Sequence, residues 1–248
     1  MPAALAVVMA MQAQGLPLNR DRVVALHRLM PVVRHLNSTR QRVRQLLLAA
    51  GLAWLTASAA AAPVAALSND ARVLVTRVTQ LNDHADAPFL VLDKRAARIW
   101  VFDAQARLKG STPVLLGLAT GDDTVPGIGE LPLSQIADAA RTTPAGRFVI
   151  EPGRNLHSDE ILWIDYESAV SMHRVRSVNA GERRLQRLAS PHAADRRISY
   201  GCINVPTAFF NRVLTPFFAE SRAIAYVLPE TRPLTAVFPF MGTRVTER

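Results

Sequence analysis

Short apolar runs separated by polar turns fill the second half of the chain and predict a mainly β domain. Residues 89–92 and 98–102 flank the polar sequence Asp93-Lys94-Arg95-Ala96, a pattern that is typical of a β-hairpin. Similar apolar runs follow, with glycine and proline between them. The other predicted strands are residues 112–118, 147–150, 161–166, 169–173 and 223–228.

A helical period replaces this pattern over residues 206–215. Phe209 and Val213 repeat at i,i+4, as do Phe210 and Leu214, which predicts one apolar helix face. Proline is tolerated in the first turn, and Pro216 is expected to end or kink the helix. The predicted fold is therefore mainly β with short helices.

Length and composition indicate one folded domain of ordinary size. The chain has 248 residues, 49% of them hydrophobic and 20% charged, which is enough to bury a full core. The small and polar stretch at residues 63–87 predicts a linker followed by lead-in structure, and residues 88–232 are expected to form the domain. Residues 233–248 are expected to be a C-terminal tail.

The net charge of +9 comes mostly from the N-terminal region. Residues 1–62 contain seven arginines against the single acid Asp21, whereas residues 63–248 contain 22 basic and 19 acidic residues. No basic stripe with interleaved aromatic residues is present, so nothing in the pattern favours binding to nucleic acid.

The N-terminal region has the pattern of an export signal. Three arginines between residues 40 and 44 precede an uncharged, alanine-rich stretch over 46–62, which predicts a secretory signal peptide at residues 40–62. An uncleaved membrane anchor is the alternative. Residues 1–39 would be an extension, with Met30 as a sensible start. We expect export to the periplasm or cell envelope.

Cys202 is the only cysteine of the chain, so it cannot form an intramolecular disulfide. A lone thiol beside apolar Ile203 is more often a small core residue than a nucleophile. Gly201, however, allows substrate to approach closely, and neighbouring N–H groups suit an oxyanion hole. The thiol would then need a base, because it is mostly protonated at neutral pH.

His173 is the best candidate for that base. It ends the predicted strand 169–173, whose alternation puts Val170 and Met172 on the core face and Ser171 and His173 on the other. The remaining histidines lie in the N-terminal region, the linker or polar loops: His27, His35, His84, His157 and His192.

Two segments resemble the L,D-transpeptidase catalytic domain, or YkuD family. The family signature is a histidine, a spacer, then Ser/Thr-His-Gly-Cys, a hydrophobic residue, and Asn or Arg. Residues 141–148 are similar to the family's Thr-Pro-x-Gly-x-Phe element. The signature is matched here by His173, a spacer, and Ser199-Tyr200-Gly201-Cys202-Ile203-Asn204.

The resemblance implies a YkuD-like β-sandwich or barrel and a peptidoglycan L,D-transpeptidase. Cys202 would be acylated by a tetrapeptide stem, with His173 as its base, and an acceptor amine would complete a 3→3 cross-link. Backbone N–H groups of Tyr200 and Gly201 would hold the oxyanion. Ser199 and Asn204 would support the loop.

The sequence departs from the family pattern at two places. Tyr200 replaces the usual histidine, and the spacer after His173 is longer than usual. Residues 174–197 of this spacer contain seven arginines, which predicts a solvated insertion with a short helix at 182–188. Because stem peptides carry carboxylates, Arg174 and Arg197 are predicted to bind substrate.

Several related functions stay open at this stage. The same acyl-enzyme could be resolved by water, as in an L,D-carboxypeptidase, or by a lysine of an envelope lipoprotein. The domain could also be a noncatalytic wall-binding module, or an exported protein whose cysteine is merely buried. No metal or cofactor is expected, since the histidines lack paired ligand spacing and no nucleotide loop is present.

Overall fold

The computed structural model describes residues 66–177, 179–218 and 222–242. Every described residue belongs to one compact unit, Pro63–Arg248. The predicted N-terminal extension and signal peptide therefore lie outside the described residues. Among the described helices, none has both the length and the apolar character needed to span a membrane.

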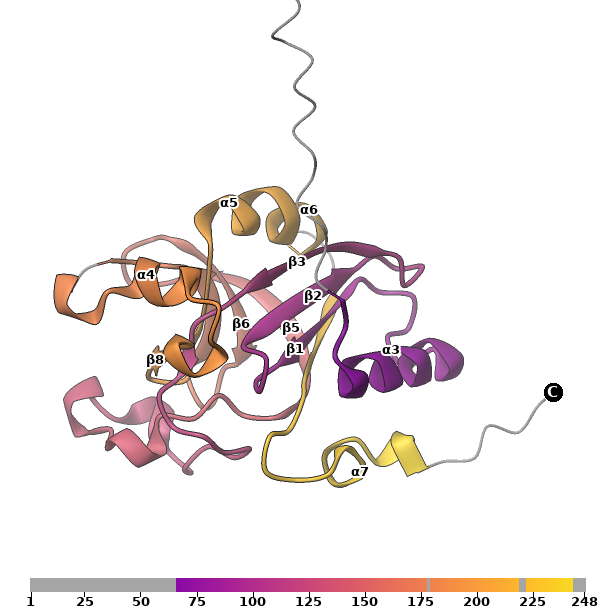
Figure 1. Cartoon of the computed structure of the whole chain (residues 1–248), viewed down its shortest axis with the longest axis horizontal. Helices are drawn as coiled ribbons and strands as arrows, with labels where there is room; N and C mark the ends of the chain where they lie inside the picture. Colours follow the sequence, from indigo (N-terminus) through magenta and orange to yellow (C-terminus); the bar gives the residue numbers. More distant parts are fainter. Residues whose placement is uncertain (1–65, 178, 219–221, 243–248) are drawn as a thin grey trace, which may run out of the picture. The chain divides into compact units, whose positions relative to one another are not determined.

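Eight strands form one sheet, which confirms the predicted mainly β fold (Figure 1). Their order is β3-β2-β1-β10-β5-β6-β7-β9. Just after β3, Leu115 forms an antiparallel bridge with Asn204 in β9, so the two edges of the sheet approach each other in a barrel-like arrangement. The strands are β1 Phe89–Asp93, β2 Arg98–Phe102, β3 Leu108–Pro113, β5 Gly146–Arg154, β6 Glu160–Asp165, β7 Val170–Arg174, β9 Ile203–Val205 and β10 Ala223–Val227.

The single strand predicted over 112–118 is wrong, because the chain changes partners there. Strand β3 ends at Pro113, and the N–H of Val114 donates to the carbonyl of Ala97. The chain resumes as β4 (Leu116–Gly117), which pairs with β8 (Arg197–Ser199) in a separate two-stranded sheet. Short 3-10 turns cover Ile128–Glu130, Leu133–Gln135, Asp138–Ala140, Ala180–Glu182 and Ala193–Arg196.

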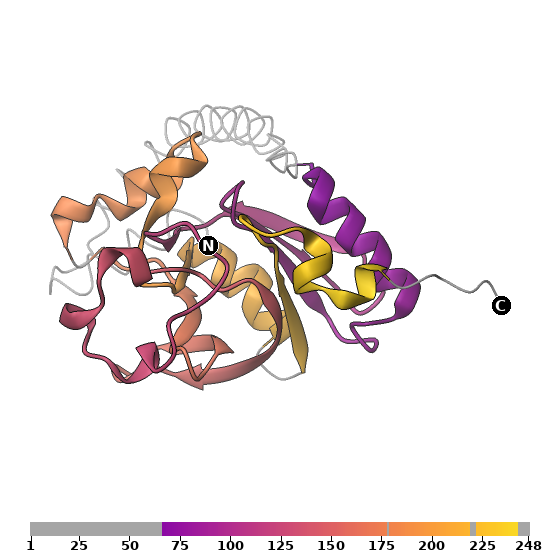
Figure 2. The ribbon, with the colours of Figure 1, turned by 90° about the horizontal axis from the view of Figure 1, so that it is seen from below.

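The central strands β1, β2 and β10 are buried on both faces, which explains their continuous apolar sequences. In β1, Leu90 and Leu92 face the first core, whereas Phe89 and Val91 face the second. Successive side chains of a strand point to opposite faces, so each strand contributes to both cores. Helices α5 (Thr207–Phe209) and α6 (Thr215–Phe218) lie on one side of the sheet, and α3 (Asn69–Leu81) and α7 (Leu234–Val237) lie on the other (Figures 1 and 2).

The predicted linker at 63–87 contains a helix, α3 (Asn69–Leu81), so that prediction was wrong. The Ser68 side chain caps the helix by accepting the N–H of Ala71. Ala71, Leu74 and Val78 are buried in the second core at i, i+3 and i+7. Tertiary packing of this narrow stripe outweighs the polar average composition on which the linker prediction depended.

The predicted tail at 233–248 also contributes to the fold. It forms α7 (Leu234–Val237) and a 3-10 turn (Pro239–Gly242). Phe238 is buried, and its ring packs against those of Tyr226 and Phe240. The domain therefore continues past its predicted end at residue 232.

The helix predicted over 206–215 extends through Pro216 to residue 218. It consists of α5 (Thr207–Phe209), a π-helical segment (Phe210–Leu214) and α6 (Thr215–Phe218). Just before Pro216, which has no N–H to donate, the backbone hydrogen bonds change from the α-helical to the wider π-helical pattern. Pro216 therefore does not end the helix, whose buried phenylalanines cover the first core.

Lys94 is a buried cation at the centre of the fold. Its side chain is 0% exposed, and Nζ lies 2.8 Å from the fully buried Oδ1 of Asp122 and 3.0 Å from the carbonyl of Thr143. Burial raises the pKa of Asp122, but hydrogen bonds from Lys94, Thr231 and the Glu230 backbone hold that pKa well below its usual range. The ionised carboxylate thus stabilises the fold at neutral pH, and this contribution is lost as the pH falls toward its native pKa.

Lys94→Met is expected to lower the free energy of unfolding by about 3–5 kcal/mol, because it removes the buried ammonium from Asp122 and leaves only the longer ion pair with Arg232. Urea denaturation measures the change. Lys109→Met is the matched control, since Lys109 is partly exposed and lies 3.6 Å from Asp103, and about 1 kcal/mol or less is expected there. Equal losses in the two variants would contradict a central role for Lys94.

Candidate active site

Cys202 lies in a tight loop between β8 and β9. The preceding Gly201 has φ +128, and a Cβ there would lie 2.7 Å from the carbonyl oxygen of Thr142, so only glycine fits without strain. The Ser199 hydroxyl donates to the carbonyl of Cys202 at 2.6 Å. This hydrogen bond closes the loop around Gly201.

Thr143 connects this loop to the segment 141–148. Its hydroxyl donates to the carbonyl of Gly201 at 2.8 Å and accepts the N–H of Gly117 at 3.0 Å. Its own carbonyl oxygen accepts a hydrogen bond from the ammonium of Lys94. The sequence drew attention to this segment only through the family resemblance, and it did not predict the contact with the nucleophile loop.

His173 lies on β7, and Cys202 directly precedes the neighbouring strand β9. Strand β7 pairs with β9 in parallel, with His173 opposite Asn204. Val170 and Met172 are buried in the first core, as the alternation predicted. The Ser171 hydroxyl lies 3.7 Å from Sγ of Cys202, a contact that the same alternation could have revealed.

The tautomer of His173 follows from its hydrogen bonds. Nδ1 lies 2.8 Å from the backbone carbonyl of Arg174, which can only accept, so Nδ1 carries the proton. In the neutral ring Nε2 then has the lone pair, and it accepts from Nδ2 of Asn204 at 3.3 Å. The carbonyl of Arg174 therefore orients the imidazole, and Nε2 is the nitrogen that can take a proton.

The environment of Cys202 favours the thiolate. Burial raises the pKa of the thiol, but the interaction with His173, together with the hydrogen bonds of Ser171, outweighs that effect and brings the pKa below its ordinary value. The sulfur is half-buried and also donates to the carbonyl of Ala169 at 3.6 Å. A half-buried thiol beside a histidine can act as a nucleophile.

The predicted oxyanion donors differ in their hydrogen bonds. The Gly201 N–H donates to the Ser199 hydroxyl at 3.2 Å, so it is already engaged. The N–H groups of Tyr200 and Cys202 have no acceptor among the described residues. The Tyr200 ring lies under the guanidinium of Arg141, 4.0 Å from its centroid, which gives this residue a packing role.

A cavity of about 290 Å³ opens beside His173. Its wall carries charges of both signs, because Arg174 pairs with Glu160 at 2.9 Å and Arg176 with Asp159 at 3.5 Å. The predicted contact of Arg174 with substrate is compatible with this location. The remaining lining residues are Asn155, Val175 and Thr207.

Arg197 lies elsewhere. Its guanidinium forms an ion pair with Glu230 and donates to the carbonyls of Lys94 and Ala119. Only 14% of its side chain is exposed. These contacts explain a structural role in the Lys94 network and leave the predicted substrate contact of Arg197 without support.

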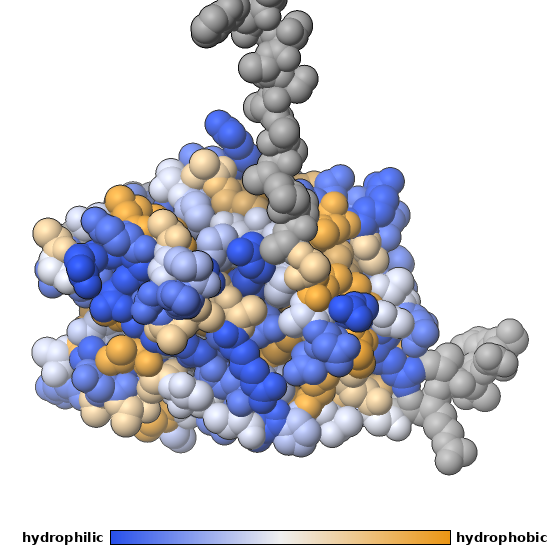
Figure 3. All heavy atoms as spheres, viewed as in Figure 1, coloured by the Kyte–Doolittle hydropathy of each residue, from blue (hydrophilic) through white to orange (hydrophobic). Residues whose placement is uncertain are grey.

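The arginine-rich insertion forms a helix, α4 (Arg184–Ala189), close to the predicted range 182–188. Hydrophilic residues cover this region in the space-filling view (Figure 3). Arg183 is exposed, as expected for a solvated insertion. Arg184 instead turns inward, with its side chain 14% exposed, and contacts the site residue Asn204. The sequence offered no signal that singles out Arg184.

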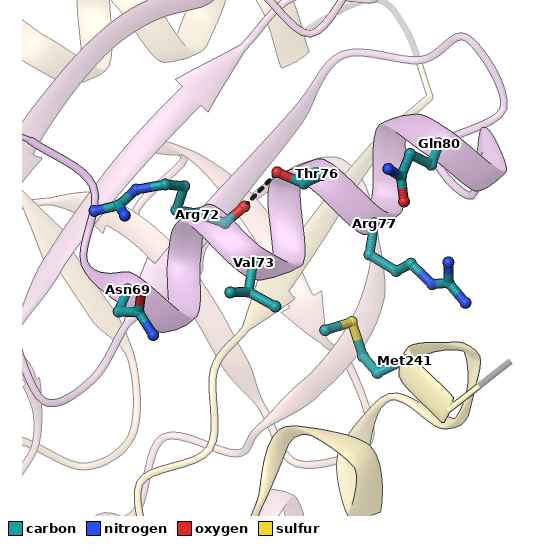
Figure 4. Close-up of a pocket in the computed structure, with 7 residues that line it drawn as sticks. All are labelled: Asn69, Arg72, Val73, Thr76, Arg77, Gln80 and Met241. Atoms are coloured by element: carbon teal, nitrogen blue, oxygen red, sulfur yellow. Dashed lines mark hydrogen bonds between the residues drawn. The ribbon is translucent and has the colours of Figure 1, made fainter. Parts of the chain in front are cut away.

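Another cavity, of about 460 Å³, lies between α3 and Met241 (Figure 4). It is lined by Arg72 and Arg77 together with uncharged residues, and it has no histidine or cysteine among its lining residues. Of the two, only the smaller cavity has His173 in its wall, and Cys202 is not among the lining residues of either cavity.

Several solved structures resemble this fold at low sequence identity. An L,D-transpeptidase (Yku) from Stackebrandtia nassauensis is 12% identical over 58% of this chain and 56% of its own, with a TM-score of 0.36. The helical cell shape determining protein Pgp2 from Campylobacter jejuni is 10% identical over 59% and 49%, with a TM-score of 0.40. The catalytic domain of an E. faecium L,D-transpeptidase is 17% identical over 58% and 98%, with a TM-score of 0.32.

The matched region spans about half the length of the first two of these proteins. No protein-family model matches the chain, and no curated protein matches it. These TM-scores do not assign an activity, so the function proposed below depends on the residues of the site.

His173→Ala is expected to raise the pKa of Cys202, because the histidine that lowers it is removed while the burial that raises it remains. The rate of alkylation by iodoacetamide, measured against pH, reports the thiolate, and Cys202 is the only thiol. The midpoint should move to higher pH in this variant. His157→Ala, which changes an exposed histidine, should leave the midpoint unchanged. An unshifted midpoint in His173→Ala would contradict the assigned pair.

Proposed function

We propose that this protein is a peptidoglycan L,D-transpeptidase that forms an acyl-enzyme on Cys202. The observation that carries the proposal is the thiol of lowered pKa beside His173, whose Nε2 can accept its proton. The family resemblance of the segments around Cys202 and Thr143 supports the same activity. The proposed substrate is a stem tetrapeptide, held in the cavity beside His173.

In the proposed reaction, the Asn204 N–H moves off the lone pair of His173 Nε2, which then takes the proton of Cys202. The thiolate attacks the carbonyl that joins the third residue to the terminal D-alanine. The tetrahedral oxyanion is stabilised by N–H groups of the Cys202 loop, with Tyr200 and Cys202 as the available donors. One such donor is worth about 3–4 kcal/mol in other enzymes. The imidazolium then protonates the leaving amine, and D-alanine departs.

A thioester remains on Cys202 after this step. The amine of a second stem attacks it while His173 removes the amine proton, and the thiol is released as the 3→3 amide forms. Charged groups of both signs around the cavity suit a stem peptide, which carries carboxylates and an amine. This chemistry requires the site to reach the wall, in agreement with the predicted signal at 40–62 and a periplasmic location.

Intact mass after incubation with a carbapenem tests the nucleophile and the base. The wild-type protein is expected to gain one carbapenem acyl adduct, and Cys202→Ala none. His173→Ala should acylate more slowly by about 10²–10⁴-fold, the usual contribution of a general base. An adduct on Cys202→Ala, or none on the wild-type protein, would contradict the proposal.

Muropeptide analysis after incubation with tetrapeptide-containing peptidoglycan separates transfer from hydrolysis. Dimers with 3→3 links that disappear in Cys202→Ala are the expected product. Tripeptides alone would identify an L,D-carboxypeptidase, because water would then resolve the thioester. An unchanged muropeptide profile would favour a noncatalytic wall-binding module.

A further inference from the structure

Arg184 reaches from the arginine-rich insertion to the residue beside the base. Its Nη1 donates to Oδ1 of Asn204 at 2.5 Å, and its Nε donates to Glu182 at 2.5 Å. Asn204 is completely buried, and its Nδ2 faces Nε2 of His173 at 3.3 Å. A hydrogen-bonded series therefore joins an inserted helix to the proposed catalytic pair.

The orientation of the Asn204 amide is fixed by its neighbour. A guanidinium has five N–H donors and no acceptor, so only the carbonyl oxygen of the amide can face Arg184. The NH₂ group must then face His173. It can donate only to a ring nitrogen with a lone pair, so it favours the tautomer in which Nε2 is unprotonated.

We propose that Arg184 is a positioning residue that keeps Nε2 of His173 unprotonated in the resting enzyme by fixing the amide of Asn204. The inference rests on the proposed function, in which Nε2 receives the thiol proton. Without Arg184, only the longer hydrogen bond from Nδ2 to the carbonyl of Cys202, at 3.5 Å, still opposes a turn of the amide that brings Oδ1 to face His173. The imidazolium would then have an acceptor at each nitrogen, namely Arg174 O and Asn204 Oδ1.

Other charged groups around His173 are paired with one another. In the adjoining cavity, Glu160 pairs with Arg174 and Asp159 with Arg176. The thiol of Cys202 is the other titratable group near the ring. Glu182 accepts from Arg184 and so partly offsets the charge of its guanidinium. The contact of Arg184 with the ring therefore runs through the Asn204 amide.

The test follows the two ring nitrogens of His173 by nitrogen-15 NMR of the full chain at neutral pH. In the wild-type protein we expect a proton on Nδ1 and none on Nε2. Arg184→Met should bring a proton onto Nε2, whereas Arg184→Lys, which still donates to Oδ1, should restore the wild-type pattern. Arg187→Met is the matched control, because Arg187 lies on the same helix but donates to the carbonyls of Glu182 and Asp195.

A double-mutant cycle separates the amide from a simple charge effect. In an Asn204→Ala background, Arg184→Met should cause no further change at His173, whereas an effect of charge alone would persist. Arg184→Ala replaces Arg184→Met if the latter does not fold. The proposal is overturned if Nε2 of His173 stays unprotonated in both Arg184→Met and Arg184→Ala. It is also overturned if Arg184→Met causes an equally large change at His173 in the Asn204→Ala background.

This experiment does not depend on catalysis. The NMR signals report the ring itself, whereas carbapenem acylation and muropeptide products report the proposed function. A protein without transpeptidase activity could still show the tautomer change, and an active transpeptidase could lack it. The two proposals therefore fail separately.

Discussion

The buried ammonium of Lys94 holds together segments that lie just outside the paired strands β1, β5 and β10. It bonds to the loop at Gly121 and Asp122 and to the carbonyl of Thr143, while Asp122 in turn accepts backbone N–H groups of residues 230–232. An unpaired buried charge is costly, so these partners cannot separate without a large loss of stability. The Thr143 hydroxyl also donates to the carbonyl of Gly201, so the same network restrains the backbone next to Cys202.

The sheet supplies the remaining precision of the site. His173 and Asn204 are register partners on adjacent parallel strands, so their spacing is set by backbone hydrogen bonds. The loop that contains Cys202 then places the sulfur beside these two residues. Sites on rigid elements keep catalytic groups within small tolerances, and nucleophilic catalysis requires such alignment.

The positions of β1, β2, β6, β7 and β10 followed from the sequence, because apolar runs such as Arg98–Phe102 are local signals, whereas β8 and β9 were not predicted. The pairing of His173 with Cys202 was foreseen from a motif and from side-chain alternation. Helix α3 and the packing of Phe238 were missed, since both depend on a second core that only the folded sheet creates. Arg184 was one of seven similar arginines, and its contact with Asn204 depends on the path of the insertion, which local sequence does not determine.

The second core unites residues from both ends of the domain. Arg77 on α3 donates to the carbonyl of Phe240, 163 positions later, and β1 pairs in parallel with β10. A ribosome must therefore release nearly the whole chain before this core can close. Contacts of such long sequence separation are costly to form early and slow folding. During synthesis the apolar residues of α3 would therefore stay exposed, and a chaperone could bind them in that period.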